Sequence, residues 1–402
     1  MSIRLFDTSQ RKVVPFDPSE IVRMYVCGIT PYDSTHLGHA ATYLAYDLLI
    51  RRLEDIGHEV RMVRNITDVD DSILPKAREL GIPYLELAAA EIARFKSDMD
   101  ALNIRPPYAE PRVTESIDAI IEMVNQLLVS ENAYLTHGTV YFDISTFPRF
   151  GELSQYSVEH MIKLARARGG RPDDPHRRDP LDFVLWQPSL PDEPAWRAPF
   201  GVGRPGWHIE CSVMAIESLG PTIDLHGGGT DLIFPHHECE IAQSESVTGK
   251  PFVRHWLHSA MVSYEGEKMS KSLGNLVFVS DLLKIADPRS IRLALLRHHY
   301  RSGFEWHDTD LDEGVALLHR LLAAAACTTG PDPEAFATRV RDAIDNDLDA
   351  PRALEALDDL ASAILSTGVD PTGESDASAP KTLRDLGDLL GVDLARPLER
   401  PV

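Results

Sequence analysis

The chain has 402 residues, of which 43% are hydrophobic and 25% are charged, and its formal net charge is −22. Such a composition is typical of a globular protein with one large domain or two to three smaller ones. No apolar run reaches the roughly 18 residues that a membrane-spanning helix needs, and the acidic balance disfavours an extended contact with a nucleic-acid backbone. Because the first residues contain no apolar signal segment, we expect a cytoplasmic protein.

The N-terminal part predicts a β-α-β unit. An apolar run at 21–26 predicts a strand, helically spaced apolar residues at 41–53 predict a helix, and 58–64 predict a second strand. Such a unit begins a doubly wound, Rossmann-like parallel sheet of the α/β class, in which ligands bind at the carboxyl ends of the strands. We therefore expect residues 27–30 and 65–67 to share one crevice.

Two histidines, His36 and His39, lie where the first strand passes into the helix, with Gly38 between them. The N–H groups and the dipole of a helix N-terminus accept phosphate, and glycine allows a ligand to approach the backbone closely. Imidazole donors can also stabilise negative charge that builds on phosphate in a transition state. On its own, however, this short sequence is more typical of an ordinary strand-to-helix junction.

Further along the chain, residues 73–129 predict helices and 133–143 predict strands. The segment 147–186 is rich in Pro, Arg and Asp and predicts an insertion into the sheet domain. Two more strands are expected at 222–225 and 253–261.

From residue 279 onward the pattern is helical. The expected divisions are the first half of a Rossmann-like catalytic domain at 1–110, an inserted connective subdomain at 111–200, the second half of the catalytic domain at 201–275, and a C-terminal helical bundle at 276–402.

The last predicted strand is followed by Lys-Met-Ser-Lys-Ser at 268–272. Two lysines three residues apart are usually part of a solvated turn. In this order, however, the histidine pair and this loop together resemble the signature elements of class I aminoacyl-tRNA synthetases. The resemblance implies that four residues hold ATP and stabilise the pyrophosphate leaving group: His36, His39, Lys268 and Lys271.

The four cysteines are widely spaced, which disfavours a disulfide framework and leaves metal binding or simple burial. They are Cys27, Cys211, Cys239 and Cys327. His236 and Glu240 are four residues apart at a predicted helix start and can face the same way. Thiolate and imidazole suit Zn²⁺, but buried cysteines and a core histidine are a slightly better explanation of the residues alone.

Four of these residues match the zinc-binding positions of cysteinyl-tRNA synthetases, within Tyr-Val-Cys-Gly, Trp-His-Ile-Glu-Cys and Pro-His-His-Glu-x-Glu. The resemblance implies a zinc site made of Cys27, Cys211 and His236, with Glu240 as a candidate fourth ligand. Zinc would select cysteine because a thiolate binds it well, whereas a serine hydroxyl keeps its proton and binds poorly. Cys239 and Cys327 are expected to be structural.

The chain also resembles the cysteine:glucosaminyl-inositol ligases of mycothiol biosynthesis, which share this catalytic core. Residues 27–43 are similar to the ligase form, and 166–172 (Arg-Ala-Arg-Gly-Gly-Arg-Pro) are similar to its Glu-Arg-Gly-Gly-Asp-Pro stretch. Only 130 residues follow residue 272, so we expect little room for an anticodon-binding domain, and residues 301–402 have 9 Lys+Arg against 21 Asp+Glu. By contrast, Glu240 and the His-Gly-Gly-Gly at 226–229 resemble the synthetases.

The ligase resemblance implies ATP-dependent formation of cysteinyl-AMP, with Mg²⁺ accompanying ATP, and transfer of cysteine to the amine of glucosaminyl-inositol. The alternative is a cysteinyl-tRNA synthetase. The expected partners are ATP, L-cysteine and glucosaminyl-inositol, without tRNA or membrane, and the protein is expected to be a monomer. A catalytically inactive relative would be expected to lack one of the four signature residues, but all are present.

Motif position also implies the residues that contact cysteine, adenosine and phosphate. Thr30, Thr67 and Trp207 are expected around the cysteine, Gly229 to Asp231 and Val262 at the adenosine, and Thr42 near the phosphates. The full set is Cys27, Gly28, Ile29, Thr30, Thr42, Asn65, Ile66, Thr67, Trp207, Gly229, Thr230, Asp231 and Val262. For the second step, either Asp231 or the leaving phosphate could act as the base.

Overall fold

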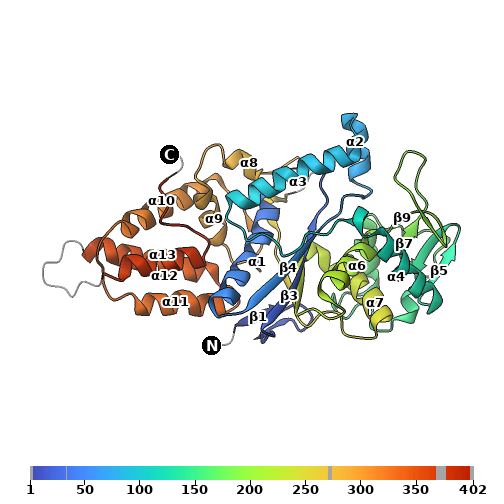
Figure 1. Ribbon diagram of the computed structural model, residues 1–402, viewed down its shortest axis with the longest axis horizontal. Helices are drawn as coiled ribbons and strands as arrows, with labels where there is room; N and C mark the ends of the chain where they lie inside the picture. Colours follow the sequence, from blue (N-terminus) through green and yellow to red (C-terminus); the bar gives the residue numbers. More distant parts are fainter. Residues whose placement is uncertain (1–2, 33, 270–273, 368–376, 399–402) are drawn as a thin grey trace.

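The computed structural model describes residues 3–32, 34–269, 274–367 and 377–398. Figure 1 shows an elongated molecule with a central parallel sheet. The C-terminal helices lie on one side of this sheet, and an antiparallel sheet with its helices lies on the other.

The central sheet has four parallel strands in the order β11-β10-β3-β4. They are β3 (Ile21–Ile29), β4 (Glu59–Ile66), β10 (Leu225–Gly229) and β11 (Trp256–Ser259). Helix α1 (Leu37–Asp55) connects β3 to β4, and its buried face includes Leu44, Leu48 and Leu53. The predicted β-α-β unit and the α/β fold class are therefore confirmed, and the carboxyl ends of β3, β10 and β4 lie side by side.

Two strand predictions were wrong in their bounds. The strand expected at 222–225 is observed at Leu225–Gly229, and the one expected at 253–261 is limited to Trp256–Ser259. Glycine has a low intrinsic preference for strands, but the packing here requires it. A Cβ atom on Gly227 would lie 2.1 Å from both the Leu257 oxygen and the Tyr46 hydroxyl, so no larger residue fits where β10 meets α1 and β11.

The insertion between β4 and β10 forms a second sheet, which is antiparallel and has the order β5-β6-β7-β9-β8. Its strands are β5 (Ala133–Thr136), β6 (Thr139–Phe142), β7 (Phe183–Gln187), β8 (Trp196–Ala198) and β9 (Gly201–Pro205). The helices of this part of the chain are α2 (Ile73–Leu80), α3 (Tyr84–Ala101), α4 (Ile117–Val129), α5 (Val158–Ala167) and α6 (Trp207–Leu219), with short helices at Val113–Glu115 and Ile144–Thr146. Beyond β10, a short helix (Thr230–Leu232) and a π-type turn (Ile233–His237) lead into α7 (Glu238–Thr248).

The C-terminal part is helical, as the apolar periodicity predicts. Its helices are α8 (Val279–Leu282), α9 (Pro288–Leu296), α10 (Asp308–Ala325), α11 (Glu334–Asp345), α12 (Ala350–Thr367) and α13 (Ala379–Leu389). Small pairings complete the fold: β1 (Arg4–Asp7) with β2 (Lys12–Pro15), and β12 (Val262–Tyr264) with β13 (Glu267–Lys268) and β14 (Phe304–Glu305). Over the described ranges, every helix is too short or too polar to cross a membrane.

A buried ionic cluster joins these helices to the catalytic sheet. Asp47 on α1 accepts hydrogen bonds from Arg51 (2.7 Å) and from Arg292 on α9. Arg292 also donates to the carbonyl of Leu390, just beyond α13. The helix that begins at the two signature histidines is thus held in place by the C-terminal part of the chain.

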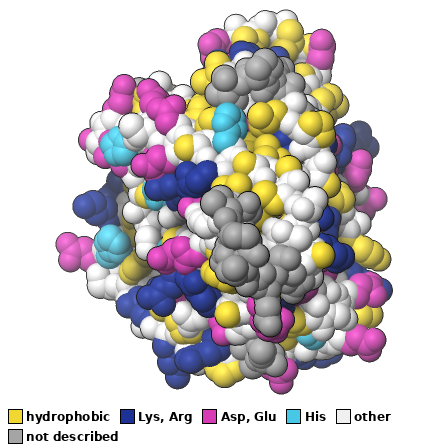
Figure 2. All heavy atoms as spheres, turned by 90° about the vertical axis from the view of Figure 1, so that its left-hand side faces the viewer, with side chains coloured by type: hydrophobic (Ala, Val, Ile, Leu, Met, Phe, Trp, Pro, Cys, Tyr) yellow, Lys and Arg dark blue, Asp and Glu magenta, His cyan; other side chains and the backbone are white. Residues whose placement is uncertain are grey.

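Figure 2 shows the end of the molecule formed by the C-terminal helices, where acidic and basic side chains are interspersed. Arg320 lies 2.7 Å from Asp358, and Arg339 lies 2.8 Å from Asp359. Each of these two arginines thus has an acidic partner that offsets its positive charge.

Candidate active site

The carboxyl ends of β3 and β4 lie side by side, where the sequence predicts a ligand crevice. The Gly28 N–H donates to Oδ1 of Asn65 (2.8 Å), and the Thr67 N–H donates to the Ile29 carbonyl (3.0 Å). A Cβ atom on Gly28 would lie 1.6 Å from the backbone carbonyl oxygen of Asn65, which explains why glycine occupies this position. Thr30 follows directly at the end of β3, while Ile66 is buried in the core beneath the crevice.

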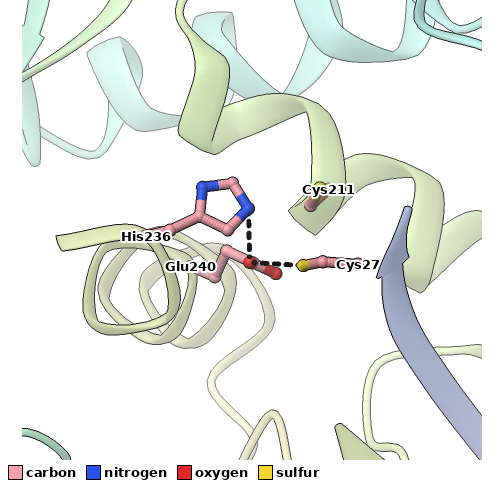
Figure 3. A group of neighbouring side chains, drawn as sticks. All are labelled: Cys27, Cys211, His236 and Glu240. Atoms are coloured by element: carbon pink, nitrogen blue, oxygen red, sulfur yellow. Dashed lines mark hydrogen bonds and ion pairs between the residues drawn. The ribbon is translucent and has the colours of Figure 1, made fainter. Parts of the chain in front are cut away.

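Four donors from four separate elements meet beside these strand ends. Cys27 comes from β3, Cys211 from α6, His236 from the turn before α7, and Glu240 from α7 itself. Their ligand atoms lie within 4.8 Å of one another, and Figure 3 shows the side chains pointing toward a common centre. Their exposed fractions are 0–7%. The four residues that the sequence analysis grouped together are therefore close in space, although Cys27 and Glu240 are more than 200 positions apart in the chain.

The electrostatics of this cluster favour charged donors despite complete burial. Burial raises the pKa of Glu240, but His226 and His236 outweigh it and lower that pKa to about 2. Burial likewise lowers the pKa of His236, but Glu240 and Cys211 raise it to about 10. The hydrogen bond from Cys27 and the charge of His236 bring the pKa of Cys211 to about 6, against the effect of burial.

The donor set fits a zinc ion. Two sulfur atoms, one imidazole nitrogen and one carboxylate oxygen form a set that this borderline-soft ion accepts in tetrahedral sites. Nε2 of His236 lies 3.0 Å from Oε1 of Glu240, and this ion pair is completely buried. Burial of charged groups is costly unless they are paired or bound to a ligand, and a metal ion is one such ligand.

Trp207 and His208, at the start of α6, pack against the same imidazole. The Trp207 ring stacks on His236 with centroids 4.2 Å apart, and Nδ1 of His208 lies 3.0 Å from Nδ1 of His236. Burial lowers the pKa of His208 to about 3, so it is neutral. Contacts of this kind fix the ring orientation of a metal-binding histidine. Trp207 thus lies beside the cluster, where a substrate cysteine is expected.

Three further histidines surround the cluster, and sequence reasoning gave none of them a role. Nε2 of His226 lies 2.9 Å from Oε2 of Glu240, and Nε2 of His237 lies 3.3 Å from the Cys27 sulfur. His258 continues the chain of contacts, 2.7 Å from His237 and 2.7 Å from the Thr8 hydroxyl. The available signal was His258 near the end of a predicted strand, but the strand order that places it here cannot be read from the sequence.

Cys27 and Glu240 also form a second group of potential metal donors, with His226 and His237, whose ligand atoms again lie within 4.8 Å of one another. Cys239 belongs to neither group. It is fully buried in the hydrophobic core, as predicted. Cys327 was expected in the core of a helix, but it lies just after α10 and is only half-buried against the core.

The histidine pair lies at the N-terminus of α1. His36 is the N-cap residue, and its Nδ1 accepts a hydrogen bond from the Gly38 N–H (3.1 Å). The ring centroids of His36 and His39 lie 3.9 Å apart, and both side chains are half-buried. One turn later, the Thr42 hydroxyl donates to the Gly38 carbonyl (3.0 Å) and lies 2.9 Å from the Ser259 hydroxyl at the end of β11.

The residues expected near adenosine lie at neighbouring strand ends. Gly229 ends β10, and Thr230 and Asp231 follow it in a short helix. A Cβ atom on Gly229 would lie 2.6 Å from Oδ1 of Asp231 and 3.5 Å from the Met261 sulfur, so the Asp231 carboxylate lies against the glycine backbone. Val262 begins β12 immediately beyond Met261.

The two-lysine loop is described only in part. The Lys268 backbone belongs to β13, where it pairs with Ser263 of β12. Lys271 lies outside the described residues. The described residues place the N-terminus of α1, the glycine-rich end of β10 and a cluster of potential metal donors at the same edge of the sheet.

Comparison with known proteins agrees with this arrangement. Residues 13–316 match the family described as tRNA synthetases class I (C) catalytic domain. The chain is 50% identical to the L-cysteine:1D-myo-inositol 2-amino-2-deoxy-alpha-D-glucopyranoside ligase of Thermobispora bispora, over 98% of this chain and 96% of that protein. It is 46% identical to the ligase of the same name from Mycobacterium marinum, again over 98% of this chain and 96% of the relative.

Solved structures share the fold at low sequence identity. Mycobacterium tuberculosis methionyl-tRNA synthetase in complex with methionyl-adenylate is 19% identical, with a TM-score of 0.65 over 92% of this chain and 89% of that one. A leucyl-tRNA synthetase of Agrobacterium radiobacter K84, solved as a ternary complex with tRNA, is 12% identical, with the same TM-score over 94% and 85% of the two chains.

Proposed function

The chain belongs to the class I tRNA synthetase family and, within it, to the L-cysteine:1D-myo-inositol 2-amino-2-deoxy-alpha-D-glucopyranoside ligases; from this we propose that it activates L-cysteine with ATP and transfers it to the amine of glucosaminyl-inositol. The products are an amide, AMP and diphosphate. The observation that carries the proposal is the near-complete coverage of ligases at 46–50% identity. The buried donor cluster supports cysteine as the amino acid.

In this proposal, Cys27, Cys211 and His236 would hold a zinc ion, and Glu240 is a candidate fourth ligand. When bound, the ion supplies a site that prefers a substrate thiolate to a hydroxyl. Shape alone discriminates between such isosteres by only about 10²-fold. Trp207 closes one side of this site through its stacking on His236, and Thr30 and Thr67 line the strand ends beside it. The chain therefore selects its amino acid by sulfur chemistry.

The first chemical step joins the cysteine carboxylate to the α-phosphorus of ATP and releases diphosphate. His36 and His39, at the N-terminus of α1, donate hydrogen bonds to the phosphates as charge moves onto the leaving group. Lys268 and Lys271 contribute positive charge, and Mg²⁺ accompanies the nucleotide. Gly229, Thr230, Asp231 and Val262 contact the adenosine, while Thr42 supports the phosphate side through its bond to Gly38.

In the second step the neutral amine of the acceptor attacks the carbonyl of cysteinyl-AMP and expels AMP. The proton leaves the amine as the amide forms, and either Asp231 or the phosphate of the departing AMP accepts it. Asp231 suits this role because its carboxylate lies against the Gly229 backbone at the edge of the nucleotide site.

A cysteinyl-tRNA synthetase is the second candidate, and one observation bears on it. Two features resemble the synthetases: Glu240 and the His-Gly-Gly-Gly that begins at His226. Nε2 of His226 lies 2.9 Å from Oε2 of Glu240. A histidine that orients a carboxylate ligand is needed only where that carboxylate is present. The two residues therefore form one coupled local feature and count as a single argument for tRNA as the acceptor.

One assay tests the proposal. Purified protein is supplied with cysteine and ATP, and AMP release is followed after addition of either glucosaminyl-inositol or tRNA. We expect rapid AMP release with the amino sugar and none above background with tRNA. Charging of tRNA without a response to the amino sugar would replace the ligase by the synthetase, and absence of cysteine-dependent pyrophosphate exchange would exclude both.

A further inference from the structure

The segment from Thr230 to Glu240 connects β10 to α7 and contains both Asp231 and His236. Its own secondary structure is limited to a three-residue helix and a single π-type turn before α7 begins. Such short turns provide few hydrogen bonds of their own to fix the backbone. The position of Asp231 and His236 must therefore depend on what packs against this segment.

The insertion packs against it at three points. Arg168, which follows α5, donates through Nη1 to the carbonyl of Asp231 (2.5 Å) and to the carbonyl of Phe234. Glu238 accepts hydrogen bonds from the backbone N–H groups of Gly151 (2.9 Å) and Ser154 (2.8 Å). These contacts hold the segment at its start and at its end.

The third point is the side chain of Phe234. It is 1% exposed and belongs to a small hydrophobic cluster with Met161 and Ala165 of α5 and with Leu181. Phe150 meets its ring edge-on, with centroids 6.2 Å apart. The end of α5 is thus fixed to Phe234, which places the Arg168 guanidinium next to the backbone that it bonds.

The position of the Asp231 backbone also decides where its carboxylate lies. The Asp231 side chain already contacts the Gly229 backbone so closely that a Cβ atom there would be 2.6 Å from Oδ1. Movement of the Asp231 carbonyl would therefore displace the carboxylate and reshape the edge formed by residues 229–231. Misplacement of binding groups by about 1 Å can cost an enzyme about 10²-fold in rate.

We infer that Arg168 is a positioning residue for the nucleotide half of the site, because it fixes the backbone of Asp231 and Phe234 against the insertion. This inference rests on the proposed function, since it assumes that the edge at 229–231 binds ATP. It also gives a role to the segment 166–172, which resembles the ligase stretch. Arg168 is the second arginine of this segment, and it supports the backbone of the 230–240 segment.

Arg166 provides a matched control on the same turn of chain. Its guanidinium pairs with Asp173 at 2.9 Å, and the two side chains are 54% and 78% exposed. An exposed pair of this kind contributes little, and it does not touch the 230–240 segment. Removal of Arg166 deletes the same charge from the insertion without changing the active-site loop.

The experiment measures cysteine-dependent pyrophosphate exchange for the wild type, Arg168→Ala, Arg168→Lys and Arg166→Ala, together with bound metal and Tm. For Arg168→Ala we expect the KM for ATP to rise about tenfold, as loss of a charged hydrogen bond implies. The KM for cysteine and the metal content should stay within about twofold of the wild type. Arg168→Lys should recover part of the loss, because an ammonium can replace a single bonding nitrogen, and Arg166→Ala should match the wild type.

A wild-type KM for ATP in Arg168→Ala would overturn the inference, as would an Arg168→Lys variant no better than the alanine variant. Loss of metal together with an unchanged KM for ATP would also overturn it, because Arg168 would then serve the metal half or general stability. These outcomes are distinct from failure of the proposed function, in which the wild type itself would show no cysteine-dependent exchange.

Discussion

The cluster of potential metal donors and the N-terminus of α1 lie at the same edge of one sheet but are built differently. The cluster uses four side chains from four elements, each at most 7% exposed and surrounded by further histidines. The helix terminus uses two half-exposed histidines, a glycine and backbone N–H groups of a single element. One half is a closed set of side-chain donors, whereas the other is a surface feature of a helix.

This difference suggests a division of labour. Buried side-chain donors can recognise the chemical nature of a ligand atom, and here they suit sulfur. Backbone N–H groups at a helix terminus recognise charge and shape, and here they suit phosphate. Variants in one half should therefore change the response to cysteine and metal, and variants in the other half should change the chemistry of ATP.

The largest effect is expected from Cys211→Ser. Loss of one thiolate from a four-donor site should lower zinc affinity by more than the roughly 10–100-fold that loss of a supporting contact costs. We expect purified Cys211→Ser to contain little zinc and to lack cysteine-dependent pyrophosphate exchange, as measured by metal analysis and isotope exchange. Cys327→Ser is the control, since Cys327 is half-buried outside the cluster. Full zinc content in Cys211→Ser would contradict the assignment.

His39→Asn tests the other half of the comparison. Removing a donor that stabilises transition-state charge typically lowers kcat by about 10²–10³-fold. We expect such a fall in pyrophosphate exchange, with zinc content and the binding of cysteine unchanged. A variant that lost its zinc would show that the two halves are not separable.

Residues of this site could be predicted where a short sequence motif contains them, and they were missed where only the tertiary structure brings them together. The sequence predicted the four-residue cluster and the position of His36 between strand and helix. Each of these residues lies in a short motif that resembles a motif of the known family, namely Cys27, Cys211, His236, Glu240 and His36. His258 was missed because only the strand order β11-β10-β3 brings it next to the cluster. The glycine strand was misplaced because local propensity disfavours glycine, while close packing against Tyr46 and Leu257 requires it.

The pKa values of the donor side chains predict a steep pH dependence of metal binding. In the metal-free protein the pKa of His236 is raised to about 10 and burial holds the pKa of Cys27 well above its usual value, so both are protonated at neutral pH. Zinc must displace both protons, whereas Cys211, with a pKa of about 6, has already lost its own. Zinc affinity should therefore rise with pH, by about 100-fold per unit for two protons released.

Competition with a chelator of known affinity between pH 6.5 and 8.5 measures this slope. Cys27→Ser should not serve as the control, because it removes a ligand. The matched control is Cys327→Ser, which removes a thiol outside the cluster and should keep the slope of the wild type. A zinc affinity that did not change with pH would mean that the donors are unprotonated before metal binds.

The smallest effect is expected from His226→Gln. His226 supports Glu240 through a single contact of 2.9 Å, and loss of an outer contact typically costs about 10-fold or more in metal affinity. We expect weaker zinc binding with unchanged kcat once the site is saturated, as measured by zinc titration of activity. An unchanged zinc affinity would indicate that Glu240 is not a ligand.

The most direct test of cysteine selection by a metal is X-ray absorption at the zinc K-edge of the purified protein, recorded with and without cysteine. The account predicts one zinc per chain with two sulfur neighbours, rising to three when cysteine binds and unchanged when serine is added at the same concentration. Protein without zinc, or a sulfur count that did not respond to cysteine, would contradict it.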